Sequence, residues 1–257
     1  IMLKITFLGT GTSQGIPVIG SQHPVCLSDD PKDKRLRVSV LLQWEGHSFV
    51  VDCGPDFRQQ MIRCKLDQLD GILFTHEHAD HTAGLDDIRP FFFRQGDIPI
   101  YLSERVHQNL AYRFNYIFSE HNKYPGAPSV NVNIIDTENP FELGKKKITP
   151  IAIQHNKLPV MGFRVDNFAY LTDVKTLVEK EFEKLQNLDH LVLSALRIEP
   201  HKNHLNLEEA LGLIDKIKPR KAYLTHISHL MGFHEEVSKE LPSNVFLAYD
   251  NLTIESN

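Results

Sequence analysis

The segment Thr75-His76-Glu77-His78-Ala79-Asp80-His81 constrains this chain more than any other part of the sequence. It places three imidazoles and a carboxylate, at positions 76, 78, 80 and 81, within six residues. The apolar run 69–74 comes directly before it and predicts a short buried strand. Imidazole and carboxylate side chains suit zinc, manganese and iron. Four such residues at the end of a strand indicate a metal site rather than a polar loop with chance histidines.

The composition is that of a globular protein with an ordinary core. The chain has 257 residues, of which 41% are hydrophobic and 24% charged. The formal net charge is −5 and there is no long basic run, so we expect no broad contact with nucleic acid. No stretch approaches the ~20 apolar residues of a membrane span, and residues 2–9 are too short for a signal peptide. Cys26, Cys53 and Cys64 cannot all pair, which favours a reducing, cytoplasmic setting.

The remaining pattern predicts groups of strands separated by helices. Strands are expected at 3–8, 38–42, 48–51, 69–74 and 98–102. Helices are expected at 103–114, 174–188 and 206–217, where Asn206 and Glu209 have the spacing of a capping box. The polar segment 119–133 predicts an exposed loop, either an ordinary connection or a lid. We expect one domain over residues 2–257, built as a layered α/β sandwich.

Further residues with acid–base or ligand chemistry stand at the ends of predicted strands: Asp52, His155, Asp173 and His226. Each alone has an ordinary explanation. Asp173, for example, is well placed to cap a helix that starts at Val174, and His226 to be a buried structural histidine. Their shared position at strand ends makes a common site the stronger interpretation.

The His-x-His-x-Asp-His motif after an apolar strand resembles that of the metallo-β-lactamase superfamily, whose fold is a four-layer αββα sandwich. The segments 8–17 and 84–91 further resemble the PhnP-like branch, and the similarity runs from residue 3 to about residue 250. PhnP-like enzymes are phosphodiesterases that act on cyclic phosphates, notably phosphoribosyl 1,2-cyclic phosphate. Ribonuclease Z and the PqqB proteins share much of the same pattern.

The resemblance implies a centre of two divalent ions, with zinc or manganese expected before iron. Its implied ligands are His76, His78 and His155 for one ion, Asp80, His81 and His226 for the other, and Asp173 as the bridge. Asp52 would support one of the ligand histidines without binding metal itself.

The resemblance also implies a mechanism in which a water between the two ions ionises near neutral pH and attacks phosphorus. His204 matches a histidine that looks catalytic in this branch, and His201 is its nearby rival. The catalytic histidine would give a proton to the departing oxygen or hold a non-bridging oxygen. Asp80 would help to orient the nucleophile. Arg89 would contact phosphate unless it is engaged in an ion pair.

We therefore expect a cytoplasmic phosphodiesterase for a small cyclic or nucleotide-like ester, dimeric if the resemblance extends to assembly. Three alternatives stay open. The first is tRNA 3′-end processing of the ribonuclease Z kind, although no basic, glycine-rich insertion predicts a tRNA-clamping arm. The second is a hydrolase for thioesters or lactams, and the third is a non-catalytic metal-binding protein.

One departure from the PhnP-like pattern concerns a second, structural zinc site. The branch often has Cys-x-Cys-x-x-Cys after the first glycine-rich turn, together with a later histidine. Here Ser21 replaces the first cysteine, which leaves His23, Cys26 and His229. A closed structural zinc site needs four ligands. The sequence predicts that this site is weakened or lost, with three-ligand binding as the minority alternative.

Overall fold

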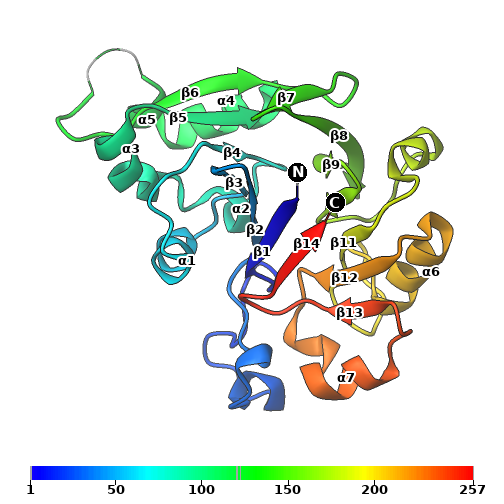
Figure 1. The fold of residues 1–257 in the computed structure, drawn as a ribbon. Coiled ribbons are helices and arrows are strands. Elements are labelled where there is room, and N and C mark those ends of the chain that lie inside the picture. Colours follow the sequence, from blue (N-terminus) through cyan, green and yellow to red (C-terminus); the bar gives the residue numbers. More distant parts are fainter. Residues whose placement is uncertain (1, 120, 122, 257) are drawn as a thin grey trace.

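The computed structural model describes residues 2–119, 121 and 123–256 and contains two seven-stranded mixed β-sheets (Figure 1). The strand order across the first sheet is β14 (Thr253–Ser256), β1 (Leu3–Gly9), β2 (Ser39–Trp44), β3 (His47–Val51), β4 (Gly71–Leu73), β5 (Ile98–Leu102) and β6 (Val130–Ile134). The order across the second is β13 (Val245–Leu247), β12 (Lys221–Thr225), β11 (His190–Ser194), β10 (Phe168–Leu171), β9 (Leu158–Val165), β8 (Lys146–His155) and β7 (Phe141–Leu143).

Each sheet has an antiparallel half and a parallel half. Strands β3 to β6 run parallel to one another, as do β10 to β13. Parallel neighbours need crossover connections, and these carry helices to the outer face of the sheet. The carboxyl ends of the parallel strands then lie together at one edge, which is where ligands bind in many α/β proteins.

Helices cover the outer faces of both sheets, so the molecule has four layers (Figure 1). The helices are α1 (Phe57–Cys64), α2 (Ala79–Thr82), α3 (Arg89–Gln95), α4 (Glu104–Arg113) and α5 (Asn115–Phe118) with the first sheet, and α6 (Leu207–Ile217) and α7 (His234–Glu240) with the second. Short 3-10 helices occupy Pro24–Leu27, Pro31–Asp33, Leu85–Ile88, Glu179–Leu185 and His229–Met231. The expected αββα sandwich is confirmed. Within the described residues, no helix has the length and apolarity that crossing a bilayer requires.

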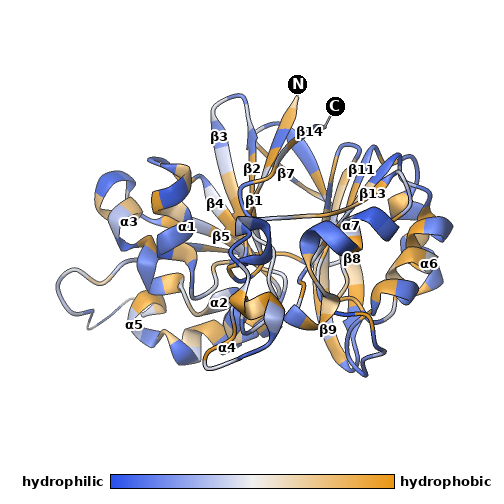
Figure 2. Cartoon of the chain, turned by 90° about the horizontal axis from the view of Figure 1, so that it is seen from below, coloured by the Kyte–Doolittle hydropathy of each residue, from blue (hydrophilic) through white to orange (hydrophobic). Residues whose placement is uncertain are grey.

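The central core lies between the two sheets. Phe7 of β1 and Tyr223 of β12 meet there, with ring centroids 5.9 Å apart, and Phe163 of β9 is fully buried in the same cluster. Two outer cores lie between each sheet and its helices. Hydrophobic and hydrophilic residues alternate along the covering helices, as Figure 2 shows. Each fully buried Phe or Leu contributes roughly 1.5–3 kcal/mol, so the strand ends project from a rigid frame.

Two predicted helix starts are confirmed in detail. Asn206 Oδ1 accepts a hydrogen bond from the Glu209 backbone at 2.9 Å, and Glu209 Oε2 accepts one from the Asn206 backbone at 2.9 Å. This capping box begins α6 as expected. Ser103 caps α4 through the Val106 backbone at 3.3 Å, and α4 ends one residue before Phe114.

The segment from Val174 to Leu188 is not the α-helix that its apolar spacing predicts. Only Glu179–Leu185 is helical, as a 3-10 helix. The backbone at 174–176 bonds to distant segments instead: Leu205 N donates to Val174 O at 3.0 Å, and Lys175 N donates to Gln154 O at 2.9 Å. The apolar spacing reflects burial of Val174 and Leu188 rather than helical structure. No helix therefore starts at Val174 for Asp173 to cap.

The predicted loop 119–133 is correct only as far as Ser129. Residues 130–133 belong to β6, which pairs in parallel with β5 through Ile98 and Val130. Asn131 and Asn133 alternate with valines there, so the polar residues obscured a strand in the sequence. Residues 120 and 122 lie outside the described residues, and a lid function for the remaining loop stays a prediction.

A buried polar network fixes the segment 10–37 against the C-terminal part of the chain. Arg35 Nη1 donates to Thr10 Oγ1 at 2.8 Å and also to the carbonyl of Ala248. Arg35 Nη2 lies 3.2 Å from His234 Nδ1. Burial, followed by the nearby Arg35 charge, lowers the pKa of His234 to about 4. The His234 ring is therefore neutral at pH 7.

This network predicts that the free energy of unfolding falls as the pH decreases from 7 toward 4. Unfolded histidine titrates near ~6.5, whereas folded His234 titrates at about 4, so the unfolded state binds the extra proton between these values. The His234→Gln substitution should make the fall shallower, by at most about 1.36 kcal/mol per pH unit for this one proton. Urea unfolding of both proteins across this pH range measures the difference. Parallel pH profiles would contradict the assignment.

Candidate metal centre

The predicted ligands gather at the edge where the carboxyl ends of strands from both sheets meet. β10, β11 and β12 are parallel, so the residues that follow β10 and β12 lie at the same edge. The segment after β4 comes from the first sheet and faces them. The cluster consists of His76, His78, Asp80 and His81 from the first sheet, and His155, Asp173 and His226 from the second.

Asp52 supports His81 in the way that the resemblance implied. Asp52 Oδ2 lies 2.6 Å from His81 Nδ1, and both residues are completely buried. Thr75 holds the same carboxylate, with its backbone N–H 2.9 Å from Oδ1 and its hydroxyl 2.8 Å from Oδ2. A carboxylate on one ring nitrogen leaves the other nitrogen free to bind a cation. His81 Nε2 therefore faces the cluster as the atom that would bind a cation.

Asp80, His81 and His226 form one side of the cluster. Their ligand atoms all lie within 4.8 Å of one another. Asp80 Oδ2 is 3.3 Å from His81 Nε2 and 3.5 Å from His226 Nε2. Gly54 makes this approach possible, because a Cβ at that position would lie only 2.2 Å from the Asp80 carbonyl oxygen. This explains why a glycine follows Asp52 and Cys53 in the turn.

Asp173 occupies the middle of the cluster. Its Oδ2 lies 3.1 Å from His81 Nε2, and its Oδ1 lies 3.3 Å from His226 Nε2. It also groups with His76 and His81 within 4.8 Å. Asp173 has a left-handed backbone with φ 54°, and Asp52 and His226 share this conformation at 65° and 56°. Sharp reversals directly after the strands thus turn all three side chains toward the cluster.

His76, His78 and His155 form the other side. Their ring centroids are 4.6 Å apart for His76–His78, 5.5 Å for His78–His155 and 6.1 Å for His76–His155. His76 is completely buried, whereas His78 is exposed. The His78 ring contacts the rings of His76 and His155, which places it on this side. Among the described residues, however, His78 is in none of the groups whose ligand atoms lie within 4.8 Å of one another.

The structure separates the two candidate catalytic histidines. The His204 ring lies 4.4 Å from His155 and 5.0 Å from His226, and its Nδ1 lies 3.8 Å from Asp173 Oδ1. His201 lies further out, 5.2 Å from the His204 ring, with its Nδ1 accepting from the Asn203 backbone. His204 also groups with His155 and Asp173 within 4.8 Å, so it is close enough to act as a ligand. The resemblance implied a catalytic place for His204 beside the metals, but not that it would lie close enough to act as a ligand.

The cluster keeps its carboxylates charged and the His76 and His155 rings neutral. Burial raises the pKa of Asp80 and Asp173, but the neighbouring histidines outweigh it and hold both pKa values far below the usual range. Burial lowers the pKa of His76 and His155. Burial also lowers the pKa of His81, yet the surrounding carboxylates outweigh it and raise that pKa above its usual value. The centre therefore favours a positive charge beside His81, which a metal cation would supply.

Unpartnered nitrogen atoms provide a direct test of whether metal ions fit. In the part of the chain that the structure describes, buried nitrogens of five clustered histidines have no hydrogen-bond partner. They are His76 Nε2, His81 Nε2, His155 Nδ1, His204 Nδ1 and both ring nitrogens of His226. Leaving a buried polar atom unpaired costs about 1–3 kcal/mol. Five such rings around two charged carboxylates fit cation binding.

Two supporting threonines escaped the sequence reasoning. Thr75 fixes Asp52, as described above, and Thr172 Oγ1 donates to Asp173 Oδ2 at 2.7 Å. Both directly precede a clustered residue, His76 in one case and Asp173 in the other. The sequence contains a signal for these threonines: a threonine directly precedes a histidine or aspartate at three strand ends. These pairs are Thr75-His76, Thr172-Asp173 and Thr225-His226.

Arg89 and the residues considered for a second zinc site, His23, Cys26 and His229, lie outside this cluster. Arg89 forms an ion pair with Asp86 at 2.6 Å and contacts Tyr124 Oη at 3.0 Å, so the ion-pair alternative is correct. His23 and His229 approach each other, with ring centroids 4.9 Å apart. Cys26 is buried and accepts a weak bond from the Val18 backbone at 3.5 Å. Among the described residues, these three form no close ligand group.

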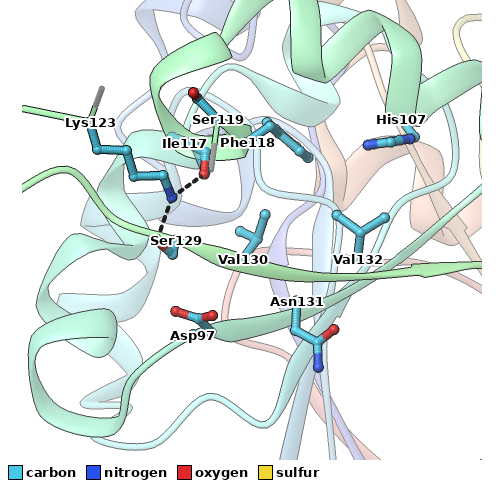
Figure 3. Close-up of a pocket in the computed structure, with 10 residues that line it drawn as sticks. All are labelled: Asp97, His107, Ile117, Phe118, Ser119, Lys123, Ser129, Val130, Asn131 and Val132. Atoms are coloured by element: carbon cyan, nitrogen blue, oxygen red, sulfur yellow. Dashed lines mark hydrogen bonds between the residues drawn. The ribbon is translucent and has the colours of Figure 1, made fainter. Parts of the chain in front are cut away.

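A cavity of about 720 Å³ between α5 and β6 is separate from the cluster (Figure 3). Lys123 extends along its rim, and its Nζ donates to the Ile117 carbonyl at 2.7 Å and to Ser129 Oγ. None of the seven predicted ligands lines it. A smaller cavity of about 250 Å³ includes His204 in its lining and so opens beside the cluster.

Comparisons with known proteins agree with this geometry. Residues 47–227 match the model of the beta-lactamase superfamily domain. A solved structure described as a new diphosphatase from the PhnP family is 38% identical, with a TM-score of 0.93, covering 100% of this chain and 98% of that one.

Curated relatives match over part of their own length. An octanoyltransferase of Porphyromonas gingivalis is 35% identical over 252 residues, which is 97% of this chain and 51% of that protein. A ribonuclease Z of Methanosarcina acetivorans is 33% identical over 105 residues, which is 39% of this chain and 29% of that protein. The chain thus spans about half of the first relative and less of the second.

Proposed function

Since this chain belongs to the PhnP family of the metallo-β-lactamase superfamily, we propose that it is a hydrolase that cleaves a small phosphodiester with two divalent metal ions. The observation that carries this proposal is the position of Asp173 between the two sides: it groups with His76 and with His155 on one side, and its carboxylate faces His81 and His226 on the other. A carboxylate with histidines on both sides is suited to bridge two cations. The similarity to a PhnP-family diphosphatase supports a phosphoryl ester or anhydride as the bond that is cleaved.

Two ions held here would supply Lewis-acid polarisation of a phosphoryl oxygen and a water of lowered pKa. The chain would hold them with the residues already described: His76, His78 and His155 on one side, and Asp80, His81 and His226 on the other, with Asp173 between. Zinc and manganese both suit this mixture of imidazole and carboxylate, and iron is the third choice. Asp80, the least buried of the carboxylates, is also placed to orient the attacking water.

His204 would hold an oxygen of the substrate. Burial, followed by the nearby His226, lowers the pKa of His204 to about 3, so its ring is neutral at pH 7 and has one N–H to donate. A neutral ring serves as a hydrogen-bond donor to a phosphoryl or leaving oxygen. It acts as a general acid only once a bound phosphate raises its pKa. His204 rather than His201 takes this role because only His204 reaches the cluster.

The cavity beside His204 supports a small, anionic substrate. Its volume of about 250 Å³ is below the ~300–1,000 Å³ of typical small-molecule pockets. Its lining contains Arg197 and three histidines but no carboxylate. Ser13 and Gln14 line it too, and their side chains have no hydrogen bond within the described residues. A phosphate ester with hydrogen-bond acceptors fits this lining better than an apolar acyl chain.

Metal removal tests the proposal. Protein treated with a chelator is expected to lose hydrolysis of bis(p-nitrophenyl) phosphate, and two equivalents of zinc or manganese should restore it. Thermal unfolding should shift upward with the returning metal, because binding to the folded state stabilises it. Metal binding without any hydrolysis would favour a non-catalytic protein. Preferential cleavage of a tRNA precursor would favour the ribonuclease Z alternative.

A further inference from the structure

Glu77, the residue between the two histidines of the motif, is held from outside the cluster by helix α4. Arg105 Nε and Nη2 both contact Glu77 Oε1, at 2.8 and 2.7 Å. Arg113 Nη1 donates to the backbone carbonyl of Glu77 at 2.8 Å. We propose that Arg105 and Arg113 are positioning residues that set the affinity of the His76–His78 side for its metal ion. This inference rests on the proposed function.

His78 has particular need of such support. Asp52 fixes the ring of His81, and Thr75 Oγ1 lies 3.0 Å from His76 Nδ1. The His78 side chain, by contrast, is exposed and forms no hydrogen bond within the described residues. Its direction is therefore controlled by its backbone. A ligand held in place before the cation arrives loses less conformational entropy on binding.

Arg113 acts on that backbone at two points. Its Nη1 lies 3.0 Å from Thr82 Oγ1 as well as 2.8 Å from the Glu77 carbonyl oxygen. Thr82 is completely buried, and its hydroxyl donates to the His78 carbonyl at 2.9 Å. The carbonyls of Glu77 and His78 are thus linked to one guanidinium, directly and through Thr82. These carbonyls belong to the two peptide units on either side of the His78 Cα atom, so fixing both fixes the backbone that carries the His78 side chain.

Helix α4 is rigid enough to act as the support. Val106 and Leu110 anchor it in the outer core with exposed fractions of 2% and 0%. Asn109 Oδ1, one turn before Arg113, accepts from Arg113 Nη1 at 3.2 Å and orients the guanidinium. The Arg105 side chain is 56% exposed and that of Glu77 is 11% exposed, so solvent screens this ion pair from the arginine side and reduces its contribution to stability. The arginines therefore matter for ligand geometry more than for folding.

The experiment measures the dissociation constants of Zn²⁺ for the metal-free full chain by competition with a chromophoric chelator. Arg113→Ala is expected to raise the dissociation constant of one of the two Zn²⁺ ions by about tenfold or more. This is within the range found when partners of metal ligands are removed. The Tm of the metal-free protein should stay at the wild-type value. Arg113→Lys, which keeps a donor, should restore part of the affinity. The matched control is Arg94→Ala, which loses a similar bond from Arg94 Nη2 to the Asp67 carbonyl, 2.9 Å long and outside the cluster.

A second set of variants tests Arg105 independently. Arg105→Ala and Glu77→Ala should each weaken the binding of the same Zn²⁺ ion. The double variant should bind this ion as tightly as Glu77→Ala alone, because either substitution removes the same Arg105–Glu77 contact. Unchanged zinc affinity in Arg113→Ala and Arg105→Ala would overturn the inference. The inference would also be overturned if the Tm of the metal-free protein fell and the affinity for both Zn²⁺ ions decreased equally, because that result would mean general destabilisation. If the wild-type protein itself fails to bind two ions, the proposed function fails first and this inference with it.

Discussion

The Asp173→Ala variant is expected to lose both metal occupancy and hydrolysis. Among the described residues, Asp173 is the carboxylate that groups with histidines of both sides, whereas Asp80 groups only with His81 and His226, so Asp80 does not replace it. Removing it leaves the groups that contain His76 and His155 without their carboxylate, while Asp80 stays beside His81 and His226. The loss of activity should exceed the roughly 10–100-fold that removal of a ligand's supporting partner causes. Metal content by atomic absorption and bis(p-nitrophenyl) phosphate turnover measure the two effects together.

Two companion variants separate this effect from backbone strain. Asp173→Asn keeps the shape of the side chain and tolerates the left-handed backbone, yet removes the charge, so it should also lose metal. Asp166→Ala changes an aspartate with the same left-handed conformation, φ 50°, at a surface turn, and should keep both ions. Wild-type activity with two bound ions in Asp173→Ala would show that Asp173 is not the bridge.

The His204→Ala variant is expected to keep both metal ions and to lose turnover. The neutral ring beside His155 and His226 has an unpartnered Nδ1, and alanine removes this contact to the substrate. If His204 transfers a proton, turnover should fall by ~10²–10⁴-fold. His204→Gln, which keeps an N–H donor but transfers no proton at neutral pH, distinguishes the two roles. Substantial rescue by glutamine would identify a hydrogen-bond donor.

The metal content of the His204→Ala variant shows whether His204 is itself a metal ligand. Because His204 groups with His155 and Asp173 within 4.8 Å, a ligand role is geometrically open. Loss of an ion from His204→Ala would assign it to the metal shell. His201→Ala serves as the comparison, since His201 lies outside the cluster and should have a smaller effect on turnover.

The sequence predicted the local part of the centre well because the motif is local. Four of the clustered residues lie within six positions, and a strand followed by a turn is enough to bring them together. His155, Asp173 and His226 were located by their strand ends and by family resemblance, since their approach depends on how two sheets pack. The distances from His204 to His155 and Asp173 arise from that packing and had no signal in the sequence.

The errors in secondary structure have the same physical origin. Val174 to Leu188 has helical spacing, but tertiary bonds from Gln154 and Leu205 occupy its backbone. Val130 to Asn133 looks polar, but pairing with β5 makes it a strand. The role of Glu77 was equally hidden, because its partners lie on α4, 28 and 36 positions along the chain. Contacts between residues distant in sequence override local preference in all three cases.

The left-handed backbone at Asp52, Asp173 and His226 is held in place by the contacts that these buried side chains make. Residues other than glycine pay of order 1 kcal/mol or more for this conformation, and only the surrounding fold keeps them there. Glycine would relieve that strain, but at Asp52 it would also remove the buried partner of Thr75 and His81, a loss of about 1–3 kcal/mol for each group left unpaired. Selection for thermal stability alone would therefore relax exposed left-handed residues such as Glu45 and Lys65 to glycine first, and would leave the buried positions of the cluster unchanged.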